Sequence, residues 1–360
     1  MIASTFNHIK ITGVASAAPT HKVHNEDYAE LFGKETVDKI IASTGVRESY
    51  HVHEKQTASD LAFAAAENLL QQQGVDSQSI GVLLFAVSYP DYFVPPSAFV
   101  LHKRLGLSRD CIVYDFDLAC SSVVYGLQLA ASLLQSSTAQ RALLLVGDTT
   151  SKMVSPYDTS RLLFGDGGGA ILLEKKEESV PMQFGLKSDG SRFKSIIVPA
   201  GGFRNPKGSR EMDIWADGNR RSDYNLYMNG TDVFSFTMTD VPALFKEFME
   251  YYHVTADDVD RLVMHQPNAF ILKHLAKKIK VPMEKVPLSL DRYGNTSGAS
   301  IPFTLSDTYG GQSGQTHRLM IAGFGVGLSW GVATLMLDTD AVLPIIHTDD
   351  YYQDGGVSHN

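Results

Sequence analysis

A cysteine at the start of a predicted helix is the first residue whose position points to chemistry. Cys120 lies where an apolar strand, ending near Asp117, gives way to an Ala/Leu-rich helix. A thiol at a helix N-terminus faces unpaired N–H groups and the positive end of the helix dipole, so we expect a lowered thiol pKa and a reactive thiolate. An isolated cysteine is more often an inert core residue, which is our interpretation of Cys111.

Two further polar residues lie at the ends of predicted elements. His265 follows the strand-like segment 262–264, at the carboxyl edge of a sheet, where α/β folds place ligands. Asn295 lies in the turn-rich stretch 291–300 that opens a helix. Taken singly, each is equally typical of an ordinary loop or turn. With Cys120 they form a candidate site if the fold brings the three together.

Two glycine-rich segments, 165–169 and 323–331, offer backbone N–H groups that a ligand can approach closely. We interpret the second as a candidate source of oxyanion donors, although a tight turn between strands explains either segment equally well. Neither is a phosphate loop, because no Gly-Lys-Ser or Gly-Lys-Thr follows and GxGxxG is not matched.

The elements that must position these residues alternate between strands and helices, which predicts an α/β fold. The expected strands are 80–87 and 141–147, and the expected helices are 59–73, with Thr57 or Ser59 as N-cap and Gly74 as its stop, and 121–135.

Two parts of the first half of the chain resemble parts of the second. The run from a polar cap through a helix to Ile80 matches a similar run ending near Val259, and the strand ending at Gly147 matches the strand ending at Gly323. Both matches have almost the same spacing in sequence, which predicts a duplicated α/β half.

We therefore predict an N-terminal half over 1–175, which carries Cys120, and a C-terminal half over 176–337, which carries His265 and Asn295. Residues 338–360 are expected to form a polar C-terminal tail. The stretch 190–225 has little periodicity and is rich in Gly, Arg, Asn and Asp, which predicts a long excursion over the surface or the mouth of the active site.

Composition limits the classes of function. The 360 residues are 44% hydrophobic and 20% charged, which is typical of a globular protein with a large core. A net charge of −9 argues against nucleic acid or an anionic membrane as partner. Two cysteines provide no disulfide framework, and no apolar run spans a bilayer, so we expect a cytoplasmic protein without membrane insertion. We interpret His21, His24, His51 and His53 as solvated residues and expect no metal site.

An ordered series of motifs gives the chain a family resemblance. It resembles the β-ketoacyl-acyl carrier protein synthase III group of the thiolase superfamily from about residue 9 to residue 337. The resemblance implies a thiolase fold with duplicated halves in a layered α/β/α/β/α arrangement. The motifs are Ser43-Thr-Gly-Val-Arg47, Asp115 to Ser122, Leu163-Phe-Gly-Asp-Gly167, Met228-Asn-Gly230 with Phe234, His265-Gln-Pro-Asn268, Gly294-Asn-Thr-Ser297 and Gly325-Val-Gly-Leu-Ser-Trp-Gly331.

The same resemblance implies a decarboxylating Claisen condensation with a 3-oxoacyl product. Cys120 would accept the acyl group, and His265 and Asn295 would bind the malonyl thioester carbonyl. The backbone N–H groups of Cys120 and Val326 would form the oxyanion hole. No bound cofactor is implied, because the decarboxylating thioester supplies its own carbanion. The other implied residues are Phe164, Phe234 and Phe324 for the acyl pocket, and Lys273, Lys277 and Lys278 for docking an acyl carrier protein.

Departures from the family pattern limit what the resemblance implies. Lys39 and Ser43 stand where many relatives have a Trp and an Arg that hold coenzyme A, so the donor is either an acyl carrier protein or a coenzyme A thioester. Phe270 replaces a docking Arg of the family, and prolines reorganise the stretch 89–96, where relatives place an aromatic residue that crosses a dimer interface. The departures predict a different acyl preference, with specialised lipid or polyketide biosynthesis as a candidate setting beside fatty acid biosynthesis. The resemblance itself implies a homodimer.

Two alternatives remain open from the sequence. An acyltransferase of the same fold would pass the Cys-bound acyl group to an oxygen, nitrogen or sulfur nucleophile. A non-catalytic partner subunit of a condensing complex would be expected to lack one of the three residues, and this chain has Cys120, His265 and Asn295.

Overall fold

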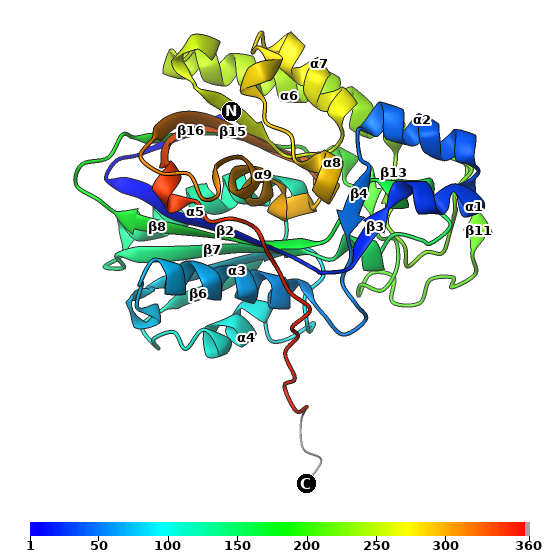
Figure 1. Ribbon diagram of the computed structural model, residues 1–360, viewed down its shortest axis with the longest axis horizontal. Helices are drawn as coiled ribbons and strands as arrows, with labels where there is room; N and C mark the ends of the chain where they lie inside the picture. The colour runs from blue at the N-terminus through cyan, green and yellow to red at the C-terminus, as the bar shows by residue number, and fades with distance from the viewer. Residues whose placement is uncertain (357–360) are drawn as a thin grey trace.

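The computed structural model describes residues 1–356 as two stacked β-sheets with helices around and between them (Figure 1). The first sheet has six strands in the order β17 (Ile346–His347), β2 (Ile9–Ala18), β8 (Gly167–Lys175), β7 (Arg141–Asp148), β5 (Val82–Val87) and β6 (Ile112–Phe116). The second has five strands in the order β1 (Ile2–Phe6), β9 (Met182–Ser188), β16 (Ser329–Asp338), β15 (Thr316–Gly325) and β14 (Arg261–Met264).

Helices form three layers around these sheets, and Figure 1 shows them above, between and below the strands. The resulting α/β/α/β/α arrangement confirms the predicted fold class. The outer face of the first sheet carries α3 (Ala58–Gln72) and α4 (Ser97–Arg104), the space between the sheets holds α5 (Ser122–Ser136) and α9 (Ser300–Tyr309), and the outer face of the second sheet carries α6 (Gly230–Tyr252) and α7 (Ala269–Lys278).

The duplication predicted from the sequence is visible in the order of the strands. The four strands β2-β8-β7-β5 of the first sheet match β9-β16-β15-β14 of the second, in order and in direction. In both sets the first three strands pair antiparallel and the last pair is parallel. The helices α5 and α9 occupy equivalent central places between the sheets (Figure 1), and the short turns that precede them contact each other.

Local sequence accounts for the packing of α3 on the first sheet. Thr57 and Asp60 form a capping box at its N-terminus, which satisfies N–H groups that the helix leaves free. Gly168 on β8 allows the helix to approach the sheet, because a Cβ at this position would come within 2.3 Å of the Leu61 backbone. The predicted stop at Gly74 agrees with a left-handed residue there, since its φ is +63°.

Both ends of the chain cross between the two halves. The boundary predicted at residues 175 and 176 falls between β8, the last strand of the first set in the sequence, and β9, the first strand of the second set. However, β1 pairs with β9 of the second sheet, and β17, from the predicted tail, pairs with β2 of the first. The first six residues therefore lie with the second half, and part of the tail belongs to a sheet. Residues 357–360 of the predicted tail lie outside the described residues.

Smaller elements gather at one end of the molecule, on the right of Figure 1. The excursion predicted from the sequence is found there as a long segment between β9 and α6 with four short strands. The elements are β3 (Lys22–His24), α1 (Ala29–Phe32), α2 (Lys34–Thr44), β4 (Glu48–Tyr50), β10 (Ile196–Ile197), β11 (Asp213–Ile214), β12 (Arg220–Arg221), β13 (Tyr227–Met228) and α8 (Leu290–Tyr293).

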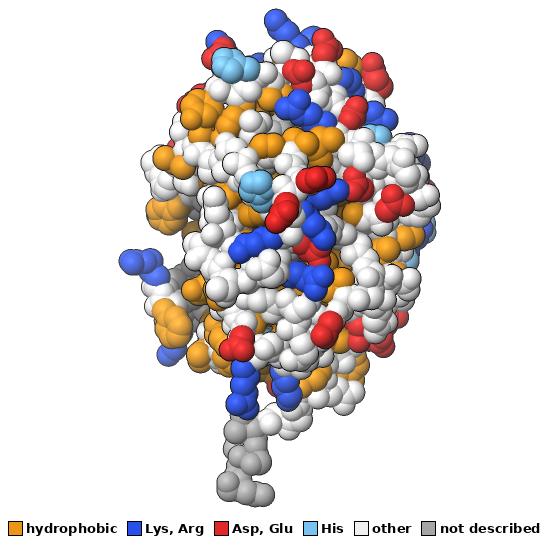
Figure 2. All heavy atoms as spheres, turned by 90° about the vertical axis from the view of Figure 1, so that its left-hand side faces the viewer, with side chains coloured by type: hydrophobic (Ala, Val, Ile, Leu, Met, Phe, Trp, Pro, Cys, Tyr) orange, Lys and Arg blue, Asp and Glu red, His pale blue; other side chains and the backbone are white. Residues whose placement is uncertain are grey.

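On the opposite face, basic and acidic side chains are intermingled rather than separated into one basic patch (Figure 2). Ion pairs join Lys10 to Asp338 and Lys176 to Glu174, so positive and negative groups offset one another. No helix within residues 1–356 is both long and apolar enough to cross a membrane.

Candidate active site

One cavity of about 980 Å³ brings together the three residues that the sequence singled out. Cys120, His265 and Asn295 all line it, although they come from distant parts of the chain. The wall is mostly apolar. A largely apolar cavity with a few convergent polar groups is typical of a small-molecule site.

Cys120 lies in a tight turn, Ala119–Ser121, immediately before α5. Ala119 has a φ of +43°, in the left-handed region, so the turn places the thiol at the helix start. Gly325 packs directly on the cysteine, because a Cβ at that position would lie 2.7 Å from the Cys120 Cβ and 3.2 Å from its Sγ. The absence of a side chain at Gly325 is therefore required for this placement of the nucleophile.

The lowered thiol pKa expected from the sequence is wrong for this structure. Burial raises the pKa of Cys120 to about 12, and the Asp148 and Asp117 carboxylates act in the same direction, whereas a hydrogen bond from Ser297 opposes them. The sulfur reaches the cavity, but dense protein surrounds it, and an ionised thiolate is poorly solvated there.

The turn between β15 and β16 faces the cysteine and carries Val326, which lines the cavity. Hydroxyl groups hold the two turns together: Ser121 Oγ lies 2.6 Å from Ser329 Oγ, and Ser329 Oγ donates to the Val326 carbonyl at 2.7 Å. The position of the Val326 backbone is thus tied to the residue that follows Cys120.

His265 follows β14 directly and is 2% exposed. Its Nδ1 lies 2.8 Å from Ser300 Oγ, and the ring meets Phe324 edge to face at 5.6 Å. Burial lowers the pKa of His265 to about 3, so the imidazole is neutral at physiological pH. The Ser300 hydroxyl itself donates to the Ser297 carbonyl at 2.8 Å. A neutral imidazole carries one ring proton, and in the tautomer with that proton on Nε2 it acts as a hydrogen-bond donor at this nitrogen.

Asn295 is held by its backbone and by one end of its amide. Its N–H donates to the Leu163 carbonyl at 2.7 Å, and its Oδ1 accepts the Ser297 N–H at 2.9 Å. Because the oxygen is engaged in this way, the NH₂ end of the amide is left to face a ligand. The site therefore has a thiol, an imidazole and an amide donor around one cavity.

Comparison with known proteins agrees with this geometry. Residues 114–190 match the family model for 3-oxoacyl-[acyl-carrier-protein (ACP)] synthase III, and residues 249–337 match the model for its C-terminal part. A β-ketoacyl-[acyl-carrier-protein] synthase III of Streptococcus sanguinis is 35% identical over 332 residues, which cover 90% of this chain and 98% of the relative. The chain belongs to the 3-oxoacyl-[acyl-carrier-protein] synthase III family.

Other members of the synthase III family are similar over nearly their whole length. A putative 3-oxoacyl-[acyl-carrier-protein] synthase 3 of Campylobacter jejuni is 33% identical over 341 residues, covering 92% of this chain and 94% of the relative. The crystal structure of a 3-oxoacyl-(acyl-carrier protein) synthase from Burkholderia xenovorans superposes with a TM-score of 0.89 at 36% identity, covering 96% of this chain and 99% of that one.

Within this synthase III fold, the predicted acyl-pocket residues are not all at the cavity. Phe164 and Phe324 line it, but Phe234 does not. Phe234 is 46% exposed and stacks on Phe270 with the ring centroids 6.2 Å apart. Phe236, two residues further along α6, lines the cavity in its place.

The residues predicted to bind a carrier lie outside the cavity. Lys273, Lys277 and Lys278 are exposed on α7, and Lys278 Nζ donates to the Met238 carbonyl at 2.8 Å. Lys39 and Ser43 are exposed on α2.

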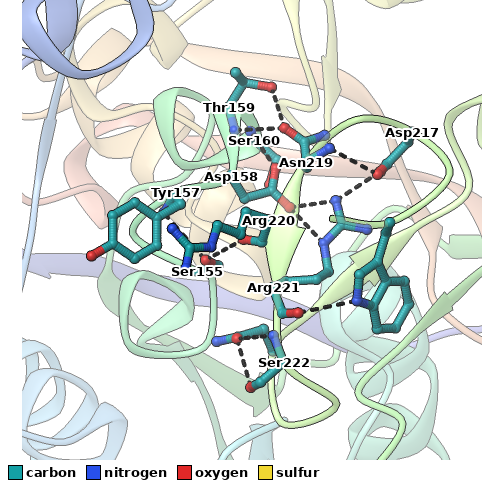
Figure 3. Close-up of polar contacts among 12 residues, drawn as sticks. Ser155, Tyr157, Asp158, Thr159, Ser160, Asp217, Asn219, Arg220, Arg221 and Ser222 are labelled. Atoms are coloured by element: carbon teal, nitrogen blue, oxygen red, sulfur yellow. Dashed lines mark hydrogen bonds and ion pairs between the residues drawn. The ribbon is translucent and has the colours of Figure 1, made fainter. Parts of the chain in front are cut away.

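The excursion between β9 and α6 forms one wall of the cavity, and a buried arginine fixes it (Figure 3). Arg221 is 2% exposed, and its guanidinium contacts Asp158 at 2.5 Å and Asp217 at 2.7 Å. Trp215 Nε1 donates to the Arg221 carbonyl at 3.0 Å. Two segments that are distant in the sequence, 155–160 and 217–222, are thereby joined beside the wall.

Sequence reasoning missed several residues of the site. Ser297 ends the recognised motif 294–297 and Ser300 ends the turn-rich stretch 291–300, but only the structure shows that one touches Cys120 and the other His265. Asp148 was also missed, although it ends a buried strand next to Gly147, a position at the carboxyl end of a strand where functional residues are often found.

Proposed function

We propose that this chain catalyses a decarboxylative Claisen condensation between an acyl group held on Cys120 and a malonyl thioester. The observation that carries the proposal is the convergence of a thiol, a neutral imidazole and a free amide NH₂ on one apolar cavity. A condensing enzyme of this kind needs a nucleophile and two fixed donors for an enolate oxygen.

In the first half-reaction the Cys120 sulfur attacks the carbonyl carbon of an acyl thioester. The carbonyl oxygen becomes an oxyanion that accepts hydrogen bonds from the backbone N–H groups of Cys120 and Val326. Collapse of this intermediate breaks the bond to the carrier sulfur and leaves an acyl-enzyme. The close packing of Gly325 on Cys120 supports this arrangement, because it brings the β15–β16 turn beside the sulfur.

In the second half-reaction a malonyl thioester places its thioester oxygen between His265 Nε2–H and the Asn295 NH₂ group. Loss of carbon dioxide puts the electron pair of the broken bond into an enolate, whose oxygen these two donors stabilise. The enolate carbon then attacks the acyl-enzyme and displaces the Cys120 sulfur, giving a 3-oxoacyl thioester. A neutral His265 suits this role, since it donates a hydrogen bond without being a strong acid.

The acyl chain would occupy the apolar part of the cavity, against Phe164, Phe324 and Phe236, with the excursion as the opposite wall. Carrier docking is proposed for α7, where Lys273 and Lys277 are exposed and Lys278 is partly engaged by Met238. We expect a Lys277→Glu substitution to raise KM for an acyl carrier protein donor, and to leave KM for a coenzyme A donor nearly unchanged.

We also propose a homodimer. β6 is the edge strand of the first sheet and carries the half-exposed Tyr114, and Phe93 near the cavity mouth is 83% exposed. An exposed edge strand beside an exposed apolar side chain is suited to pairing with a second copy. Light scattering that finds a monomer at micromolar concentration would contradict this part of the proposal.

The proposal is tested by intact-protein mass spectrometry with a panel of acyl-coenzyme A and acyl-carrier-protein donors, followed by addition of a malonyl thioester. We expect an acyl adduct that is absent in Cys120→Ala, then carbon dioxide release with a 3-oxoacyl product. Transfer of the acyl group to an oxygen, nitrogen or sulfur acceptor without carbon dioxide would contradict condensation. No adduct from any donor would instead favour a non-catalytic partner subunit.

A further inference from the structure

Two buried hydroxyls join the turn that carries the nucleophile to the turn between β15 and β16. Ser121 is 0% exposed and Ser329 is 2% exposed, and their Oγ atoms lie 2.6 Å apart. Ser329 Oγ lies 2.7 Å from the Val326 carbonyl, and Ser121 Oγ lies 3.1 Å from the Leu118 carbonyl. Each hydroxyl has one proton to donate. The two shortest contacts therefore form a chain in which Ser121 donates to Ser329 and Ser329 donates to Val326.

The Ser329 hydroxyl is the hydrogen-bond partner that Val326 has among residues 1–356. Neither the N–H nor the carbonyl of Val326 is bonded to another backbone group. Leu328, in the same turn, is instead tied to Asp189, because these two residues exchange N–H···O bonds at 2.8 and 3.0 Å. The turn is thus held through its backbone at Leu328 and through a side-chain hydroxyl at Val326.

The free N–H of Val326 is suited to a ligand oxygen. Val326 lines the cavity beside Cys120 and Gly325. A backbone N–H that has no acceptor in a largely apolar wall is unfavourable unless a ligand accepts from it. The direction of this N–H follows from the backbone dihedral angles at Val326, and the Ser329 hydroxyl holds the carbonyl of the same residue.

The turn that carries Cys120 is held from its other side without these hydroxyls. A Cβ on Gly298 would lie 3.1 Å from the Ala119 carbonyl, so the turns 119–121 and 297–299 are in contact. The Gly298 N–H donates to Asp148 at 3.3 Å, and the same carboxylate accepts the Ser88 N–H at 3.1 Å. Loss of either hydroxyl should therefore displace the oxyanion donor rather than the sulfur.

We propose that Ser121 and Ser329 are positioning residues that direct the Val326 N–H at the oxyanion formed on the acyl carbonyl. This inference rests on the proposed function. The oxyanion forms twice, first when the Cys120 sulfur attacks the donor thioester and again when the enolate carbon attacks the acyl-enzyme. Decarboxylation of the malonyl thioester places its enolate oxygen at the two side-chain donors described above. That step should not depend on the chain of hydroxyls.

The test compares Ser329→Ala with Ser306→Ala, a matched control. Ser306 and Ser16 also form a buried hydroxyl pair, 3.1 Å apart and 2% and 0% exposed, but neither lines the cavity. We expect the single-turnover rate of acyl-enzyme formation at saturating donor to fall about 30-fold in Ser329→Ala, less than the roughly 100-fold or greater cost of removing an oxyanion donor itself. The half-saturating donor concentration should stay within about twofold, because the donor is bound as before. Ser306→Ala should be acylated at the wild-type rate.

Iodoacetamide alkylation of Cys120 distinguishes a displaced donor from a displaced nucleophile. Alkylation expels iodide from a saturated carbon and forms no oxyanion, so it depends on the sulfur and not on the Val326 N–H. We expect Ser329→Ala to be alkylated at the wild-type rate. Slow alkylation of this variant, or acylation as fast as that of Ser306→Ala, overturns the proposal.

A double variant tests whether the two hydroxyls act as one chain. Ser121→Ala should slow acylation by itself, because the Ser329 oxygen loses the donor that holds it. In the Ser329→Ala background the same change should have no further effect, since no hydroxyl remains there for Ser121 to hold. Multiplied effects of the two changes overturn the chain.

The second half-reaction provides an independent readout. When enzyme acylated beforehand receives a malonyl thioester, Ser329→Ala should release carbon dioxide at the wild-type rate and form the 3-oxoacyl product more slowly. Enolate that is not captured takes a proton from water and leaves as an acetyl thioester. This variant should therefore release more carbon dioxide per 3-oxoacyl product than Ser306→Ala, and an equal ratio overturns the proposal.

Failure of the proposed function gives a different pattern. Malonyl-dependent 3-oxoacyl product from the wild type, together with normal acylation of Ser329→Ala, would leave condensation standing and remove the positioning role. An acylated wild type that forms no 3-oxoacyl product, together with slow acylation of Ser329→Ala, would do the opposite.

Discussion

The buried carboxylate at Asp148 should make the fold less stable at neutral pH, and Asp148→Asn tests this with a defined sign. Burial raises the pKa of Asp148 from 3.8 to about 6. This shift corresponds to about 3 kcal/mol of destabilisation above pH 6, where the carboxyl is ionised in both the folded and the unfolded state. Asn keeps an oxygen for one backbone N–H and loses the other bond, which costs about 1 kcal/mol. We therefore expect the variant to be more stable by about 2 kcal/mol at pH 8.

The difference should shrink as the pH falls from 6 to 4. Over this range the folded wild type takes up a proton before the unfolded chain does, so the destabilisation by the buried charge is lost. Urea unfolding followed by circular dichroism at pH 8, 6 and 4 measures the difference in free energy of unfolding between Asp148→Asn and the wild type. Asp189→Asn is the control, because the Asp189 side chain is partly exposed and hydrogen bonds from Ser191 lower its pKa, so this change should not stabilise. The reasoning is refuted if Asp148→Asn is no more stable than the wild type at pH 8.

Four further predictions follow from the site. Gly325→Ala should reduce the rate of acyl-enzyme formation about 100-fold, measured by single-turnover mass spectrometry, because the new methyl group would displace Cys120, and a normal rate would contradict the packing argument. Asn295→Asp should slow malonyl decarboxylation about 100-fold by removing a donor, while acylation persists. Ser300→Ala should lower kcat for decarboxylation with little change in KM, because the imidazole loses the contact that orients it at Nδ1. Arg221→Leu should reduce the free energy of unfolding by about 3 kcal/mol in urea titrations and raise the acyl-donor KM, and unchanged values would contradict its role in the wall.

Local sequence was sufficient for much of the fold. The cap at Thr57 and the left-handed stop at Gly74 fixed α3 within a residue or two, because both signals act over a single turn. The duplication was also visible from sequence, since the strands ending at Gly147 and Gly323 have similar runs of apolar residues. The ordered motifs shared with the synthase III family then predicted that Cys120, His265 and Asn295 belong to one site.

What the sequence did not indicate depends on contacts between distant segments. The prediction of a lowered Cys120 pKa used only the helix that follows it, whereas Gly325, from the other half of the chain, packs directly on the cysteine and contributes to its burial. Phe234 and Phe236 lie on the same helix, and the packing of Phe236 on Trp330, with centroids 5.2 Å apart, decides which one faces inward.

The crossing of the chain ends has a consequence for how the protein is made. β17 completes the edge of the first sheet, and residues on either side of it hold it there: Leu343 N–H donates to the Val14 carbonyl, and Tyr352 N–H donates to Asp60 in the capping box of α3. A ribosome delivers these residues after the whole of the second half. The half that carries the nucleophile, although synthesised before the second half, therefore waits for residues made after that half before its sheet is closed.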